Sequence, residues 1–270
     1  MRYAIRYETT YQYTKPVVEN HNVLRVKPAT NVRQICEEFR VTTDPEVRLH
    51  RYSDYFGTEV IDFGAERPHD RLDIDVRAIV ATQDPPDPPD RSWQRIENAS
   101  YRAAGAEYLL DAGEQPPAGS LDALIRQSRA RSPLATLLLV SELVPDTFEY
   151  RPGATYVGST IADLLEVGAG VCQDFVHLSL ALLRAHGIAG RYVSGYLFAA
   201  PSDGSEDSVE VNTHAWIEAL LPAGDGEDPV WVGADPTNRG LAGQQHVKIG
   251  HGRMYSDVPP IRGVYRGSEV

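Results

Sequence analysis

One cysteine in this 270-residue chain stands where a nucleophile could be activated. Cys172 follows the short glycine-containing stretch 168–171 and opens a run with apolar residues at helical spacing, which predicts a helix that begins near the cysteine and stops at Gly187. The first turn of a helix has free N–H groups and the positive end of the helix dipole, and both favour a thiolate. The glycines would allow a tight turn and a close approach of substrate. A small buried cysteine at a helix start is the plainer interpretation of this stretch alone.

A histidine and an aspartate further along the chain favour the catalytic interpretation. Residues 212–220 alternate as a half-buried strand, which places His214, Trp216 and Glu218 on one face. A short apolar strand follows after a Gly/Asp/Pro-rich connection and ends at Asp235. If the two strands are neighbours, His214 lies within hydrogen-bond reach of Asp235. Together with the cysteine, this is a nucleophile, a base and a group that orients the base.

Here the chain resembles the bacterial transglutaminase-like cysteine enzymes. The stretches that carry the resemblance are, in order, GVCQDFVHLSLALLRAHGIAGRYVSGY, THAWIEALLP and WVGADPTN. The start, MRYAIRYETTYQYTKPVVENHNVLRVKP, is similar to the β-rich N-terminal domain of that family, and the end, HVKIGHGRMYSDVPPIRGVYRG, to its C-terminal signature. The resemblance covers nearly the whole chain. It departs at one position, because Met254 stands where related sequences have the aspartate of GRDY.

The resemblance implies a triad in which Cys172 is the nucleophile, His214 the base and Asp235 its orienter. It also implies a papain-like or transglutaminase-like core, in which a helix bundle packs on an antiparallel sheet. The expected reaction is acyl transfer at an amide or peptide bond through a thioester, with the Cys172 N–H as one oxyanion donor. Hydrolysis is favoured because water is the default acceptor, and a protein-glutamine amine transferase is the alternative. A non-catalytic binding scaffold is a second alternative, and a redox thiol would need Cys36 as its resolving partner.

The surrounding segments predict an α+β protein with two domains. Residues 1–83 carry short alternating runs typical of an antiparallel β-sandwich. The runs are 2–13, 23–26, 32–42, 47–52, 59–63 and 72–82. The Pro/Asp-rich segment 84–90 is a stiff linker. Residues 91–270 form the catalytic domain, helical over 91–187 and β-rich over 188–270. Within it, Ser120 is the expected N-cap of a helix over 121–129, and residues 101–110 are expected to be extended or irregular.

Charge and cysteine content limit the partners and the compartment. The formal net charge of −12 argues against nucleic acid or an anionic membrane as a partner, since both bind basic surfaces. A peptide, a protein or another amide is the expected substrate. Two cysteines in a chain of this length fit a reducing compartment. The N-terminus alternates like a strand and lacks the apolar run of a signal peptide, so a cytoplasmic location is expected.

Other residues near the motifs have mainly structural interpretations. No histidine or cysteine spacing is typical of a metal site and no dinucleotide fingerprint is present, so neither a metal nor a cofactor is expected. His246 and His251 should alternate to opposite faces of a strand. Gln173, His177 and Trp216 are candidates for oxyanion or supporting roles, although core packing explains Trp216 and His177 equally well. The acidic stretch 201–210 is a surface loop that could instead overhang the site as a lid.

Overall fold

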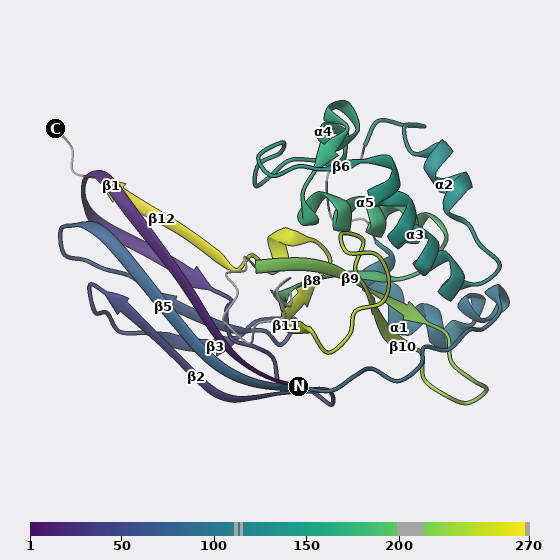
Figure 1. The fold of residues 1–270 in the computed structure, drawn as a ribbon, viewed down its shortest axis with the longest axis horizontal. Helices are drawn as coiled ribbons and strands as arrows, with labels where there is room; N and C mark the ends of the chain where they lie inside the picture. The colour runs from purple at the N-terminus through teal and green to yellow at the C-terminus, as the bar shows by residue number, and fades with distance from the viewer. Residues whose placement is uncertain (111–112, 114–115, 199–212, 268–270) are drawn as a thin grey trace, which may run out of the picture.

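The computed structural model describes residues 1–110, 113, 116–198 and 213–267. An N-terminal antiparallel sheet lies on one side, and a core of helices on a second sheet lies on the other (Figure 1). This arrangement confirms the α+β class. The stretch 201–210, expected to be a surface loop or alternatively a lid, lies outside the described residues.

The N-terminal sheet is organised around one long strand. Its strands are β1 (Arg2–Leu24), β2 (Gln34–Asp44), β3 (His50–Ser53), β4 (Glu59–Phe63), β5 (His69–Thr82) and β12 (Ile261–Gly267). The first half of β1 pairs with β5, and its end pairs with β4 and with β12. Within the described ranges the strands expected as a sandwich form a single hydrogen-bonded antiparallel sheet. The alternating apolar residues expected on one face of β5 are buried, and they are Leu72, Ile74, Val76, Ala78 and Val80.

Strand β12 crosses the expected domain boundary. It comes from the C-terminal end of the chain, yet it lies antiparallel beside β1 (yellow beside purple in Figure 1), with Leu24 opposite Ile261. The N-terminal sheet is therefore built from both ends of the sequence. Apart from β12, the division into two domains at 84–90 stays a prediction. Residues 84–90 themselves contain no helix or strand.

The core contains the helices and two very short strands. The helices are α1 (Ala99–Leu109), α2 (Asp122–Ser128), α3 (Pro133–Thr147), α4 (Ile161–Val167), α5 (Cys172–Ala185) and the 3₁₀ helices η1 (Trp93–Glu97) and η2 (Tyr255–Asp257). The short strands are β6 (Glu149–Tyr150) and β7 (Ala169–Gly170). The expectation of an extended segment over 101–110 was wrong. Tyr101 and Gly105 are buried on one side of α1, and the Tyr101 hydroxyl donates to the Leu220 carbonyl, so tertiary contacts favour the helix. Ser120 is also not a cap, because α2 begins after Leu121 without a side-chain cap.

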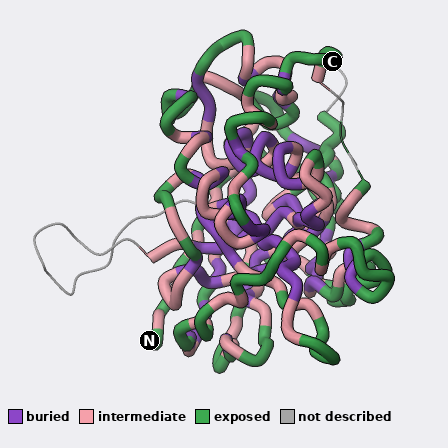
Figure 2. The backbone as a smooth tube through the Cα atoms, turned by 90° about the vertical axis from the view of Figure 1, so that its right-hand side faces the viewer, coloured by how far each residue is buried: buried purple, intermediate pink, exposed green. Residues whose placement is uncertain are grey.

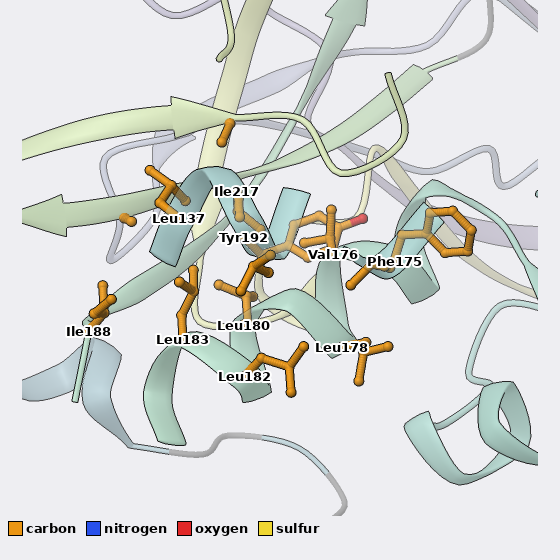
Figure 3. Close-up of a cluster of buried hydrophobic side chains, with 14 of the residues drawn as sticks. Leu137, Phe175, Val176, Leu178, Leu180, Leu182, Leu183, Ile188, Tyr192 and Ile217 are labelled. Carbon is orange, nitrogen blue, oxygen red and sulfur yellow. The ribbon is translucent and has the colours of Figure 1, made fainter. Parts of the chain in front are cut away.

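Helix α5 is the central element of the core. Its apolar side chains pack against α3 and the second sheet, as Figure 3 shows for Leu180 and Leu183, which lie in one cluster with Leu137 of α3 and Ile217 of the second sheet. Burying each of these side chains contributes about 1.5–3 kcal/mol. Buried segments gather in the middle of the molecule, and exposed segments lie at its periphery (Figure 2). Because α5 is fixed along its length, its first residue has a defined position.

The second sheet has the strand order β10-β9-β8-β11 in the described part of the chain. Its strands are β8 (Gly190–Leu197), β9 (Thr213–Leu221), β10 (Val230–Ala234) and β11 (His246–Gly252). Ala215, Ile217 and Ala219 of β9 face α5, so Trp216 and Glu218 point to the opposite face. None of the described helices is both long and apolar enough to cross a bilayer.

Candidate active site

The start of α5 is fixed by its own third residue. The carboxylate of Asp174 accepts hydrogen bonds from the Val171 N–H at 2.8 Å and from the Thr155 hydroxyl at 2.6 Å. An acidic side chain in the first turn also complements the helix dipole. Cys172, the first residue of α5, is partly exposed, and its N–H has no partner within the helix. The position expected for a nucleophile is therefore present.

One of the glycines before Cys172 allows the expected tight turn, and another has a role that was not expected. Gly168 ends α4 with a φ of +70°, a conformation that favours glycine. A side chain at Gly170 would collide with Asp174 and Leu164. Gly170 thus makes room for the carboxylate that caps α5, where we expected it to make room for a substrate.

His214 and Asp235 meet as their strands predict. Strands β9 and β10 are antiparallel neighbours, and Asp235 follows the last residue of β10. His214 Nε2 lies 2.8 Å from Asp235 Oδ2. Burial would lower the pKa of His214, but hydrogen bonds to Asp235 and Cys172 outweigh it and raise the pKa to about 9. Since Nε2 is engaged by Asp235, Nδ1 is the ring nitrogen left for Cys172.

The carboxylate of Asp235 is held by more partners than the sequence suggested. Its Oδ1 accepts from the backbone N–H groups of Thr237 and Asn238. Its Oδ2 accepts from His214, from the Asn238 side chain at 2.8 Å and from His246 Nε2 at 3.0 Å. Burial acts to raise the pKa of Asp235, but these donors hold it well below its usual range. Asp235 is therefore ionised and fixed in one orientation.

His246 is the residue that sequence reasoning missed. The Gly243 N–H donates to its Nδ1 at 3.2 Å, so Nε2 carries the hydrogen that it shares with Asp235. Trp216 is buried between the two histidines: its ring stacks on His214 and meets His246 edge-on, with centroids 5.2 Å apart. The only sequence signal for this role was a histidine in a strand, which is too common to identify it.

Three of these groups could also hold a metal ion. The ligand atoms of His214, Asp235 and His246 lie within 4.8 Å of one another. In the structure they are joined by hydrogen bonds through Asp235 Oδ2, and Nδ1 of His246 is already an acceptor. The geometry matches a carboxylate that orients two imidazoles.

The remaining candidates lie beside the triad. His177 is partly buried, desolvation lowers its pKa to about 4, and its Nε2 accepts the N–H of Tyr255. The imidazole is therefore neutral, and its hydrogen bond to Tyr255 holds η2 in place. Gln173 and His177 line a cavity of about 220 Å³ along α5, and Met254 lines the same cavity. The apolar thioether of Met254 thus lies at the position where this chain departs from the GRDY of related sequences.

A tyrosine marks the outer side of the site. Tyr150 pairs with Gly170 through β6 and β7, which brings it beside the start of α5, and half of its surface is exposed. Burial and the neighbouring Cys172 and Asp235 raise its pKa. An exposed aromatic ring next to a thiol can contact a bound substrate.

Both the N-terminal region and the core of the chain are similar to transglutaminase-like proteins. Residues 122–236 match the transglutaminase-like superfamily, and residues 3–81 match the bacterial transglutaminase-like N-terminal region. An uncharacterized protein of Mycobacterium leprae is 33% identical over 268 residues, 98% of this chain and 94% of that protein. The protein-glutamine gamma-glutamyltransferase of Pseudomonas aeruginosa is 26% identical over 190 residues, 65% of this chain and 27% of that protein. A Cytophaga hutchinsonii structure named a "putative cysteine protease" has a TM-score of 0.76 at 21% identity, covering 99% of this chain and 87% of that one.

Proposed function

Because the chain belongs to the transglutaminase-like superfamily, we propose that it hydrolyses amide or peptide bonds through a thioester on Cys172. One observation carries the proposal: a partly exposed thiol at a helix start lies beside a histidine, and Nε2 of that histidine is held at 2.8 Å by a buried carboxylate. This is the arrangement that activates a cysteine nucleophile.

The proposed reaction has two halves. The Cys172 thiolate attacks the carbonyl carbon, and the Cys172 N–H stabilises the oxyanion, a contribution of roughly 3–4 kcal/mol for one well-placed donor. Protonated His214 gives its proton to the leaving amine as the C–N bond breaks. In the second half, His214 takes a proton from water, the hydroxide attacks the thioester, and the acid product leaves with the thiolate restored. Asp235 keeps the imidazole in the tautomer that both halves need.

Amine transfer is the second candidate, and one finding favours it. The P. aeruginosa relative carries the name of a glutamine amine transferase. The two reactions differ only in whether water or an amine resolves the thioester. Hydrolysis is the preferred proposal because Cys172 is partly exposed and water reaches such a site unless something excludes it.

The two candidates predict different products from one assay. The protein is incubated with a mixture of peptides that includes glutamine-containing ones, with and without an added primary amine. We expect new amino groups or ammonia to be released at a rate that changes less than about twofold with the amine, because water resolves the intermediate. Mass spectrometry identifies the products. Incorporation of the amine faster than release in water alone would instead identify an amine transferase.

A further inference from the structure

A cavity of about 370 Å³ lies on the side of the second sheet that faces away from α5. Strands β8 to β11 form its floor, and the N-terminal segments 31–34 and 56–58 form its walls. Among the described residues that line it, neither Cys172 nor His214 occurs. Ligand pockets of this size are found where two parts of a chain meet.

The charges that line this cavity are opposite to the charge of the whole protein. The chain has a formal net charge of −12. Among the described lining residues, however, Arg33, Arg191 and Lys248 are basic and Glu218 alone is acidic. Buried charges without enough counter-charge are costly unless a ligand supplies it. The cavity therefore favours an anion.

The charged groups form a fixed cluster on the floor. Arg191 Nε and Lys248 Nζ each lie 2.6 Å from the same oxygen of Glu218, and all three side chains are largely buried. The Arg191 guanidinium also lies 4.0 Å from the centroid of the Trp231 ring. Lys248 gives one of its three donors to Glu218, and no other described side chain accepts from it. Burial lowers its pKa to about 8, although Glu218 acts in the opposite direction.

A β-bulge brings two histidines to the same cavity. The pairing of β11 with β8 shifts between Lys248 and Gly250, so His246 and His251 point to one face. The expectation of opposite faces was wrong because the bulge adds a residue. Burial lowers the pKa of His251 to about 3, so it is neutral and adds no positive charge. His246 lines the cavity and also donates to Asp235.

We infer that this cavity is a binding site for a small organic anion that carries a carboxylate or phosphate group. Lys248 and Arg33 would take up its charge, and Trp216 and Trp231 would contact its apolar part. The inference is independent of the proposed hydrolysis.

The test is a titration that does not depend on turnover. Glutarate, inorganic phosphate and neutral glutaramide are added to the whole protein at constant ionic strength, and tryptophan fluorescence and the melting temperature are recorded. We expect glutarate or phosphate to change the fluorescence and raise the melting temperature, because a ligand that binds only the folded state stabilises it. Binding of glutarate would show that the site takes a carboxylate, and binding of phosphate would show that it takes a phosphate group. Glutaramide, which is neutral, should have no effect.

Three variants locate the binding. Lys248→Met should weaken binding at least tenfold, and it leaves Glu218 paired with Arg191. Arg33→Gln lies at the wall, where it is partly exposed, and should weaken binding several-fold without a folding defect. Arg67→Gln changes the net charge equally but does not line the cavity, so it should bind as the wild type does. Binding of neither anion, or equal binding by all three variants, would overturn the inference.

Discussion

Replacing Cys172 with alanine is expected to reduce amide or peptide turnover by roughly 10⁴-fold or more, because the thioester cannot form. Cys172 is partly exposed at the start of α5, and the cap made by Asp174 does not depend on its sulfur. The variant should therefore melt within a few degrees of the wild type. Product release from the peptide mixture measures the loss, and a melting curve checks the fold.

Two matched variants accompany this change. Cys172→Ser should also be inactive, since a serine hydroxyl is a much weaker nucleophile in a site built for a thiolate. Cys36→Ala removes the other cysteine, which lies in β2, and should keep full activity. If Cys172→Ala retained the activity or the cellular effect of the wild type, the binding-scaffold alternative would replace the enzyme.

Asp235→Asn is expected to reduce turnover by about 10²- to 10⁴-fold and to destabilise the fold by about 2–3 kcal/mol. The carboxylate accepts from His214, His246 and Asn238 on one oxygen and from two backbone N–H groups on the other. An amide presents an NH₂ group to donors in either orientation. Steady-state rates and denaturant unfolding measure the two effects.

The pH dependence of this destabilisation has a defined sign. The pKa of His214 is raised to about 9, so the His214–Asp235 pair contributes fully below about pH 6.5 and its contribution is lost as the pH rises through 9. The stability gap between wild type and Asp235→Asn should therefore shrink between pH 7 and pH 10. A gap that stayed constant over this range would contradict the charged pair.

His246 offers a graded control for the same carboxylate. His246→Leu removes one donor to Asp235, whereas His246→Gln can keep an N–H near the position of Nε2. The leucine variant should lose about tenfold in turnover, the value of one hydrogen bond to a charged group, and the glutamine variant less. Equal losses in both variants would indicate that His246 acts through packing against Trp216.

The sequence predicted the local part of the site well. The helical spacing after Cys172 and the alternation around His214 were sufficient to place a thiol at a helix start and a histidine beside Asp235. These predictions rest on periodicity within one element and on the pairing of consecutive strands. Their catalytic roles stay predictions.

The parts that the sequence did not predict depend on distant contacts. His246 reaches Asp235 from a strand on the far edge of the sheet, and a bulge decides which face His251 occupies. Strand β12 pairs with β1 across more than 200 residues, and no local pattern specifies that partner. Helix α1 contains a glycine that weakens its helical signal, but that glycine lets the helix approach Ala189 closely.

The central claim is that Cys172 and His214 form a reactive pair, and the rate of iodoacetamide alkylation against pH tests it most directly. Peptide mass spectrometry follows Cys172 and Cys36 separately, and burial raises the pKa of Cys36, which makes it an internal slow reference. We predict that Cys172 reacts rapidly below pH 7 and that His214→Gln moves its profile toward that of a free thiol, which ionises near pH 8.5. A Cys172 that titrates as an ordinary thiol in the wild type, or that is unaffected by His214→Gln, would contradict the claim.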